Sequence, residues 1–361
     1  MNVVNRARTA IRVHDMASAD TPVLLMVSGG SDSTALAYIA SELVDFGVLG
    51  PVAILHVNHN LRGRDSDEDA EFVARLAGLL GMKFVSASVD VGGIAESENG
   101  NVEAVARRER YRVAHEALAE LCREAGKPIT SGRIFVAHSA NDRIENFYMR
   151  SIVGTGPGGF RSMLYVNGLV ARPLLDVSRK ALRDYTIGRI ERELPVVRDE
   201  HEMLWREDAT NGHTDRFRAY VRHEIVPRAL DRNPNLVETL TRTMNLIGDE
   251  DDMLDDMARN LFERSVVWLE PAEQGCVLSP LLAAERVPMQ RRVAIMVLER
   301  FLGADERIDT ATVEAVLAAF ADGKPNSGYV ANVQGNLAVS ANKQGVRVEP
   351  MAAFRTRRKR A

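Results

Sequence analysis

The sequence has few cysteines, no long apolar run and no large excess of charge. Its two cysteines, Cys122 and Cys276, lie far apart and form no C-x-x-C pair, which argues against a disulfide framework, a structural zinc site and a redox dithiol. No segment approaches the roughly 18 apolar residues that a membrane span needs, and residues 1–20 lack the apolar core of a signal peptide. We therefore expect a cytoplasmic protein with no membrane partner.

The charge balance excludes a globally basic nucleic-acid-binding protein. The chain has 46 Lys and Arg residues against 50 Asp and Glu residues, a net charge of −4. Any site for a polyanion must therefore be a local patch. A length of 361 residues with 45% hydrophobic and 27% charged residues is typical of a globular protein with two or three domains.

Short apolar runs alternate with helical periodicity in the first part of the chain. The runs cover residues 22–27, 52–57, 84–89 and 133–137. This alternation predicts an α/β fold, with a mostly parallel sheet covered by helices. From about 216 to 261 the pattern is helical and highly charged, and its acidic run, 249–256, is expected to be a solvated helix start.

The stretch that joins the first strand to the next helix is rich in small residues, with the sequence SGGSDS at 28–33. A Ser/Gly loop between a strand and a helix N-terminus leaves backbone N–H groups pointing outward, with the helix dipole behind them, and so predicts an anion site. Asp32 adds an oxygen that could hold Mg²⁺ between phosphates. The alternative is an ordinary turn in which Asp32 or Ser31 only caps the helix.

Histidines follow the second predicted strand. His56 and His59 would lie at the carboxyl edge of the sheet, where open α/β folds bind ligands. The alternative is that His56 points into the core and His59 caps a turn. A GxGxxG match at 154–159 follows a predicted helix instead of a strand, so we do not interpret it as a dinucleotide site.

Two further stretches carry candidate functional side chains. In VAHSANDRIEN, residues His138, Asp142 and Glu145 would share one helix face, so the carboxylates could bind a metal or a cationic amine. A solvated acidic face is the alternative. Residues 205–228 mix arginines with Trp, Phe and Tyr, a combination that suits an RNA backbone and unstacked bases.

The SGGSDS loop resembles the signature of N-type ATP pyrophosphatases, the PP-loop enzymes that cleave ATP between the α- and β-phosphates. The order of the other motifs is similar to that of the tRNA(Ile)-lysidine synthetase family: HVNHNLRG, ARRERY, AHSANDRIEN, GTGPGG, RPLL, and EDATN followed by RAYVRHEIVP. The resemblance is specific from about residue 22 to 230 and weaker to about 348. It implies a doubly wound, Rossmann-like catalytic domain at 1–215, a tRNA-contacting helical linker at 216–261, a small α+β tRNA-binding domain at 262–350 and a basic tail at 351–361.

The resemblance also implies a reaction. ATP, with Mg²⁺, would adenylate the C2 oxygen of the wobble cytidine of tRNA(Ile) with a CAU anticodon, and L-lysine would then displace AMP. The residues implied for ATP binding are Ser28, Gly29, Gly30, Ser31, Asp32, Ser33, His56 and His59, with Asp32 as the metal ligand. The residues implied for catalysis are Asp142, Glu145, Arg110 and His138. Those implied for RNA binding are Arg216, Arg218 and Arg222.

We expect Asp142 and Glu145 to bind the lysine amine or a metal, with Asp142 favoured as the base, and Arg110 and His138 to stabilise the adenylate phosphate. The sequence departs from the family pattern at several positions: Ser139, Asn141, Arg143, Asn146, Val153, Ala219 and Tyr220. We interpret the chain as a divergent but active member. A homodimer is left open.

Three alternatives stay open from the sequence alone. A tRNA thiolase would share the loop but needs paired cysteines for its sulfur chemistry. An amidotransferase-type ligase would need a glutaminase partner and no basic, aromatic segment. A catalytically degenerate tRNA-binding protein would have lost the carboxylates, and Asp32, Asp142 and Glu145 are retained.

Overall fold

The computed structural model describes residues 2–60, 64–206, 216–271, 274–303 and 306–360, without the side chains of residues 64, 65, 216 and 360. The chain divides into two compact units, Met1–Ile247 and Gly248–Ala361. The boundary lies within the long helix α10 (Leu236–Ser265). Each unit has its own sheet and its own core.

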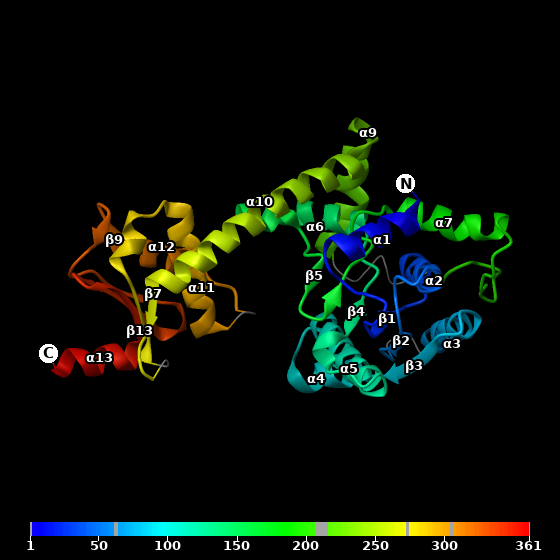
Figure 1. Cartoon of the computed structure of the whole chain (residues 1–361), viewed down its shortest axis with the longest axis horizontal. Helices are drawn as coiled ribbons and strands as arrows, with labels where there is room; N and C mark the ends of the chain where they lie inside the picture. Colours follow the sequence, from blue (N-terminus) through cyan, green and yellow to red (C-terminus); the bar gives the residue numbers. More distant parts are fainter. Residues whose placement is uncertain (1, 61–63, 207–215, 272–273, 304–305, 361) are drawn as a thin grey trace. The chain divides into compact units, whose positions relative to one another are not determined.

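The first unit contains a six-stranded sheet with the order β3-β2-β1-β4-β6-β5 (Figure 1). The strands are β1 (Val23–Met26), β2 (Val52–Asn58), β3 (Lys83–Ser88), β4 (Arg133–Phe135), β5 (Val166–Asn167) and β6 (Val170–Ala171). All neighbours pair in parallel except β5 and β6. This arrangement confirms the predicted α/β fold with a mostly parallel sheet.

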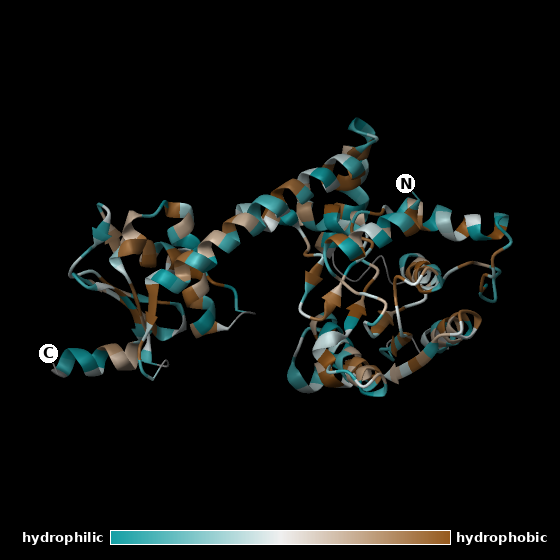
Figure 2. Cartoon of the chain, in the orientation of Figure 1, coloured by the Kyte–Doolittle hydropathy of each residue, from teal (hydrophilic) through white to brown (hydrophobic). Residues whose placement is uncertain are grey.

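Helices cover both faces of this sheet. Alternate residues of β1 point to opposite sides, so Leu25 joins one core and Leu24 the other. The core with Leu25 also includes buried residues of four helices: α1 (Val3–Val13), α2 (Ser31–Asp45), α3 (Arg64–Leu79) and α7 (Arg179–Glu191). The core with Leu24 includes residues of α4 (Val91–Glu98) and α5 (Val102–Glu124). Figure 2 shows the central strands as apolar.

The strand order reverses between β1 and β4. The chain proceeds from β1 outward to β2 and β3, whereas β4 lies on the other side of β1. In open α/β sheets the carboxyl ends of the two strands at such a reversal form the ligand-binding crevice. Here β1 runs into the Ser28–Ser33 loop, and β4 runs toward His138 and α6 (Ala140–Val153). The sequence therefore brings its two richest motifs to the same edge of the sheet.

A small helical layer completes the first unit. It contains α6, α8 (Arg216–Tyr220), η4 (Val221–Ile225), α9 (Val226–Arg232) and the beginning of α10. Its core consists of Ile144, Val221, Val226 and Met244, all of them buried. The glycines at 154–159 follow α6 and lead into a 3-10 turn, η2 (Pro157–Arg161), so this GxGxxG match does not follow a strand.

The second unit is an antiparallel sheet with helices. The strand order is β11-β12-β13-β8-β7, made of β7 (Val266–Trp268), β8 (Cys276–Leu278), β11 (Val330–Val333), β12 (Leu337–Asn342) and β13 (Gly345–Pro350). Helices α11 (Val287–Leu302) and α12 (Thr310–Ala318) share the main core with these strands. The residues predicted as a basic tail form α13 (Met351–Arg360), whose Met351 and Phe354 pack against Ala338 of β12.

The acidic run 249–256 was predicted to be a solvated helix start, and this prediction was wrong. The run lies inside α10, and Asp251 and Asp255 form ion pairs with Arg292 of α11. The two aspartates are one helical turn apart, so a single guanidinium from a neighbouring helix reaches both.

Candidate active site

The Ser28–Ser33 loop exposes the N-terminus of α2. Gly30 is the N-cap of this helix and provides no side-chain cap, so the first N–H groups of α2 have no acceptor from a capping side chain. Side-chain hydroxyls instead hold the loop from within. The Ser33 hydroxyl donates to the Gly30 carbonyl (3.0 Å) and accepts from the Ser28 amide (3.2 Å), and the Thr34 hydroxyl donates to the Gly29 carbonyl (3.0 Å). The loop is therefore a fixed group of donors at a positive helix end, which suits an anion.

Gly29 is the residue on which the shape of this loop depends. Its φ of +92° lies in the region that favours glycine. A Cβ atom there would lie 3.3 Å from Cγ of Arg206, whose amide donates to the Gly29 carbonyl (2.9 Å). Arg206 is itself held by Asp69, to which its Nε donates at 2.8 Å. A segment far along the chain thus packs directly against the loop.

Three carboxylates and three arginines form one network beside the loop, which we call the arginine–carboxylate cluster: Asp32, Asp142, Glu145, Arg179, Arg218 and Arg222. Arg179, the first residue of α7, donates to Asp32 Oδ2 and to Asp142 Oδ1, each at 3.2 Å. Arg218 donates to Asp142 Oδ1 (3.0 Å) and to Glu145 Oε2 (2.8 Å). The Arg179 side chain therefore connects the anion loop directly to the carboxylates of α6.

Glu145 is the most enclosed member of the cluster. It is 2% exposed, and Arg222 donates to both of its oxygens, at 2.7 and 3.0 Å. A buried carboxylate needs paired donors of this kind because an unpaired charge there would be costly. Glu145 is thus built to hold a cationic group, and arginines of this chain take that place in the structure.

The two aspartates of the cluster differ in their pKa. Burial raises the pKa of Asp32, and the charge of Asp142 adds to this effect, whereas Arg179 opposes it. Burial alone would also raise the pKa of Asp142, but Arg179, His138, the Ser139 amide and Arg218 outweigh it and lower that pKa. Asp142 is therefore firmly ionised and a weak proton acceptor, which weakens the prediction that it acts as the base.

His138 and Arg110 lie beside the cluster with unsatisfied polar atoms. Burial, opposed by the charge of Asp142 and aided by those of Arg172, Arg218 and Arg110, lowers the pKa of His138 to about 4. The imidazole is therefore neutral at neutral pH. Within the described part of the chain, His138 Nδ1 and Arg110 Nε have no hydrogen-bond partner. Burial also lowers the pKa of Arg110. A guanidinium whose buried Nε has no acceptor favours an anion as its missing partner.

Comparison with known proteins assigns the family. A family model described as a PP-loop domain matches residues 4–229, which is more than half of the chain.

The chain belongs to the PP-loop domain family. This PP-loop chain is 33% identical over 306 residues to a tRNA(Ile)-lysidine synthase of Solibacter usitatus, a match that covers 84% of the chain and 62% of the relative. It is 29% identical over 316 residues to a tRNA(Ile)-lysidine synthase of Geobacter sulfurreducens, covering 87% of the chain and again 62% of the relative. The chain thus spans about three fifths of the length of these curated relatives.

Among solved structures, the U34-tRNA thiolase NcsA from Methanococcus maripaludis superposes with a TM-score of 0.50 at 14% sequence identity. The superposition covers 68% of this chain and 78% of that chain. At this identity the likeness concerns the PP-loop fold alone.

The residues predicted for ATP binding, catalysis and RNA binding lie in different parts of the site. Ser28 to Ser33 form the anion loop, and Asp142, Glu145, Arg218 and Arg222 meet in the cluster. His56 is buried beneath the loop, where its Nδ1 lies 3.0 Å from the Val27 carbonyl. His59 follows β2 and is half-buried. Arg216 begins α8, but its side chain lies outside the described residues, as do residues 61–63 and 207–215 of the predicted motifs.

The sequence pattern does not single out Arg179, and it places Arg206 only in a basic stretch. Both are ordinary arginines in the sequence, and their partners Asp32 and Asp69 lie more than a hundred residues away. One local signal was available for Arg179. Ser178 caps α7 by accepting from the Ala181 amide, which places Arg179 at the first position of a helix that follows the RPLL motif.

Four departures from the family pattern have hydrogen-bond partners, and one of them, Asn146, accepts from Arg150 Nε within α6 (3.0 Å). Ser139 is the N-cap of α6, and its amide and hydroxyl both donate to Asp142 Oδ2, at 2.8 and 2.9 Å. Asn141 accepts from the Arg179 amide (2.8 Å) and so fixes the start of α7. Arg143 is 1% exposed and donates to Asp176 (3.1 Å) on the side of α6 that joins α10. These residues hold α6, α7 and Asp142 in position and do not disrupt the arginine–carboxylate cluster.

The remaining departures are not explained by any contact with the site. Val153 and Tyr220 are exposed.

In the described residues, no helix is long and apolar enough to cross a membrane. The same part of the chain holds no group of three or more His, Cys, Asp or Glu side chains placed to bind a metal.

Proposed function

We propose that this chain is a tRNA(Ile)-lysidine synthase, an ATP-dependent carbon–nitrogen ligase that joins L-lysine to C2 of the wobble cytidine of tRNA(Ile) with a CAU anticodon. The observation that carries the proposal is the bridge of Arg179 between Asp32 of the anion loop and Asp142 of α6. It would put a nucleotide bound at that loop within one side chain of a carboxylate pair suited to an amine. The curated relatives that bear this name align over more than four fifths of the chain.

The anion loop would bind the phosphates that leave as pyrophosphate. The C2 oxygen of cytosine is a poor leaving group, so the reaction first attaches AMP to it and then displaces AMP. The exposed N-terminus of α2 is suited to the negative charge of the departing pyrophosphate. Arg110 and the neutral His138 have unused polar atoms for the adenylate phosphate.

Asp32 is the carboxylate that would hold Mg²⁺, because it belongs to the anion loop and lies in the first turn of α2. Mg²⁺ commonly binds through one or two carboxylates plus substrate phosphates, so a site with one protein carboxylate is sufficient. When bound, this ion would supply charge neutralisation to the triphosphate. His56 would support the end of β1 from beneath, and His59 would lie near the nucleotide.

Glu145 and Asp142 would bind the ammonium group of lysine. The ammonium group of free lysine has a pKa near 10.4, so its deprotonation at pH 7 costs about 4–5 kcal/mol. The arginines around the cluster lower this cost, because positive charge beside the amine favours its neutral form. We assign Asp142 to orientation and ion pairing, since its lowered pKa makes it a weak base.

RNA contact is assigned to the α8–η4 segment with Arg216, Arg218 and Arg222. The Arg218 side chain is 36% exposed while it pairs with both carboxylates, so the same residue can face an RNA loop and the cluster. Guanidinium groups suit both phosphates and unstacked bases.

The alternatives are disfavoured by the cysteines and by the cluster. Both cysteines are buried, Cys122 in α5 and Cys276 in β8, and burial raises the pKa of each thiol, to about 12 for Cys276. A thiolase needs reactive sulfur, which these positions do not provide. A degenerate RNA-binding protein would have no need of an enclosed carboxylate such as Glu145.

The test is incorporation of radiolabelled lysine into transcripts of tRNA(Ile) with CAU and tRNA(Met) with CAU, each with and without ATP. We expect ATP-dependent labelling of tRNA(Ile) alone. Glu145→Gln should lose most of this labelling, because the neutral amide cannot pair with the ammonium group. Pyrophosphate release without lysine transfer in the unmodified chain would contradict the choice of nucleophile and leave only adenylation.

A further inference from the structure

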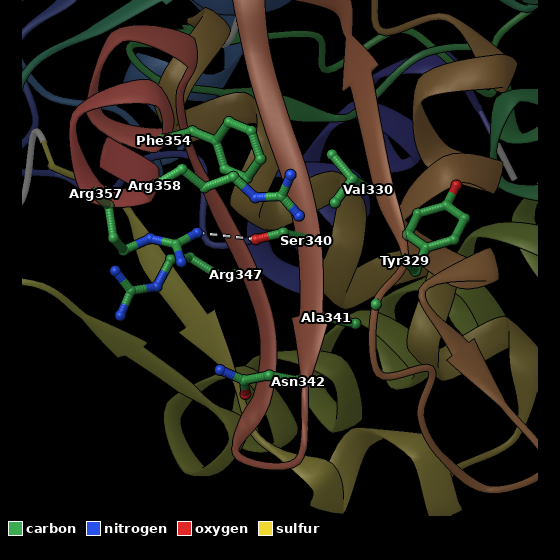
Figure 3. A pocket seen from close by; sticks show the side chains of 10 residues that line it. Tyr329, Val330, Ser340, Ala341, Asn342, Arg347, Phe354, Arg357 and Arg358 are labelled. Carbon is green, nitrogen blue, oxygen red and sulfur yellow. Dashed lines mark hydrogen bonds between the residues drawn. The ribbon is translucent and has the colours of Figure 1, made fainter. Parts of the chain in front are cut away.

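Arginines without a carboxylate partner mark places where a bound anion would balance the charge. Among the described residues, Arg358 and Arg183 are of this kind. Arg358 lines a pocket of about 120 Å³ between α13 and the strands β11 to β13, in the region that the sequence already assigns to tRNA (Figure 3). Arg183 belongs to α7 in the first unit and lies beside the Ser28–Ser33 loop. The proposed reaction assigns no role to Arg183.

Helix α7 lies beside α2, and the contacts between the two helices determine which residues of α7 reach the loop (Figure 1). Tyr185 and Arg189 both contact Glu42 in the last turn of α2, the Tyr185 hydroxyl donating at 2.7 Å and Arg189 Nη1 at 3.0 Å. These contacts fix the position of α7 along α2. Arg179 and Arg183 are one helical turn apart, and both reach the N-terminal end of α2.

The guanidinium of Arg183 is held beside the loop by two contacts. Its Nε donates to the hydroxyl of Ser31, the first residue of α2, at 3.4 Å. Its Cζ lies 5.6 Å from the centre of the Trp205 ring, a distance typical of a cation–π contact. Trp205 is 9% exposed and precedes Arg206, whose amide donates to the Gly29 carbonyl, so the ring is itself fixed next to the loop. The fold thus orients the Arg183 side chain toward the loop.

Arg179 and Arg183 differ in the charges around them. Arg179 contacts the carboxylates of Asp32, Asp142 and Glu145. Arg183 is exposed and contacts no carboxylate in the part of the chain that the structure describes. An anion that binds the loop would therefore meet one arginine whose charge is already balanced and one whose charge is available. The planar guanidinium group matches phosphate oxygens in a bidentate geometry.

The anion at this loop would be the part of ATP that leaves as pyrophosphate. Adenylation breaks the bond between the α-phosphorus and the oxygen that bridges it to the β-phosphorus, and the electron pair of this bond stays on the bridging oxygen. The pyrophosphate therefore gains negative charge as the bond breaks. A helix N-terminus offers a charge equivalent to only about half a proton, whereas a guanidinium offers a full positive charge. Arg183 would thus stabilise the transition state more than it stabilises bound ATP.

We propose that Arg183 binds the β- and γ-phosphates of ATP and stabilises the departing pyrophosphate, with Trp205 as the positioning residue that holds its guanidinium. The inference rests on the proposed function for the bond that is broken. Binding of a nucleoside triphosphate requires neither tRNA nor lysine, so the contact can be tested separately from the transfer reaction.

The experiment measures two affinities of the full chain by isothermal titration calorimetry in the presence of Mg²⁺. One ligand is α,β-methylene-ATP, which cannot be cleaved between the α- and β-phosphates, and the other is AMP. The variants are Arg183→Gln and Arg183→Lys, which keeps the charge but loses the fork of donors. Arg183 is exposed and has no ion pair to lose, so its substitution leaves the core intact. The matched control is Arg192→Gln, at an exposed arginine that ends α7 and lies 5.4 Å from the Tyr185 ring.

We expect Arg183→Gln to weaken the binding of α,β-methylene-ATP about tenfold and the binding of AMP less than about twofold, because AMP has no β- or γ-phosphate. Arg183→Lys should recover part of the loss, and Arg192→Gln should change neither affinity by more than about twofold. An unchanged affinity of Arg183→Gln for the ATP analogue would overturn the proposal. An equal loss for AMP would also overturn it, since it would show that Arg183 only maintains the shape of the loop. Loss of tRNA affinity with normal binding of the analogue would replace ATP by an RNA phosphate.

Turnover separates this proposal from the proposed function. If the chain transfers lysine, Arg183→Gln should lower kcat about tenfold and raise the inhibition constant of pyrophosphate about tenfold, with the KM values for lysine and tRNA unchanged. An unchanged kcat would overturn the stabilisation of the departing pyrophosphate. If the unmodified chain transfers no lysine but Arg183→Gln still loses affinity for the ATP analogue alone, the phosphate contact stands and the reaction must be reassigned.

Discussion

Arg179 shows how one residue can connect two parts of a site. Its side chain is 25% exposed, and its guanidinium contacts Asp32, Asp142 and, at 3.7 Å, Glu145. Burial lowers its pKa, but these three carboxylates more than compensate and raise it. The residue is held at both ends, because its amide donates to Asn141 and its side chain ends among the acids.

Arg179→Gln should therefore reduce both stability and activity. Removing one partner from a buried ion pair costs about 3–5 kcal/mol, and the remaining Arg218 and Arg222 should limit the loss to about 2–3 kcal/mol. Urea unfolding measures this change, and lysine incorporation should fall at least tenfold. The control is Lys180→Gln at the next position of α7, where the side chain is 85% exposed and pairs with Asp184. Equal losses in both variants would contradict a special position for Arg179.

The elements around the site depend on local rules that are visible in the sequence. Strands β1 to β4 were predicted because each is a short apolar run between helical patterns, and the Ser28–Ser33 loop was predicted because small residues join β1 to α2. Strands β5 and β6 were missed, since each has only two residues and no periodicity to detect.

The ion pairs of the site could not be predicted from local rules. Arg218 and Arg222 were assigned to RNA from their basic, aromatic setting, and the structure joins them to Glu145, 73 and 77 residues away. Pairing of this kind depends on which charged side chains the fold brings together, and spacing along the chain contains no such information. The sequence places Asp142 and Glu145 on one face of a helix, but it does not indicate which arginines pair with them.

The loop between β1 and α2 makes its own prediction. Gly29→Ala should lower the free energy of unfolding by about 1–2 kcal/mol, because alanine is strained at a φ of +92° and its Cβ would crowd Arg206. Gly30→Ala is the matched comparison. Its φ is −68°, and its Cβ would lie 3.6 Å from the Ser28 hydroxyl, so its stability should change by less than about 0.5 kcal/mol. Denaturant unfolding measures the stability of both variants. Equal stability would show that the loop adjusts its backbone to accommodate a side chain at position 29.

At the scale of the whole chain, stability is divided between separate cores. The first unit has cores on both faces of its parallel sheet, and the second has a core between its antiparallel sheet and the helices α11 and α12. Because each unit buries its own apolar side chains, we expect each to contribute its own thermal transition.

Leu298→Ala tests this expectation. Leu298 is fully buried in the second core, so its truncation should cost about 2–5 kcal/mol. Calorimetry should show one transition shifted to lower temperature and the other unchanged. Leu281→Ala, at a position 56% exposed in the same unit, should shift neither transition by more than about one degree. A single transition that moves as a whole would show that the two units unfold together.

The bridge at Arg179 also has a consequence for the order in which substrates bind. A cation that arrives at Asp32 with a nucleotide competes with Arg179 for that carboxylate, and the released guanidinium then strengthens its pairing with Asp142. Binding of nucleotide at the anion loop thereby changes the electrostatic field at the carboxylates that would bind the amine. Thermodynamic linkage makes this effect reciprocal, so the affinity for the amine should depend on bound nucleotide by the same factor as the affinity for nucleotide depends on bound amine.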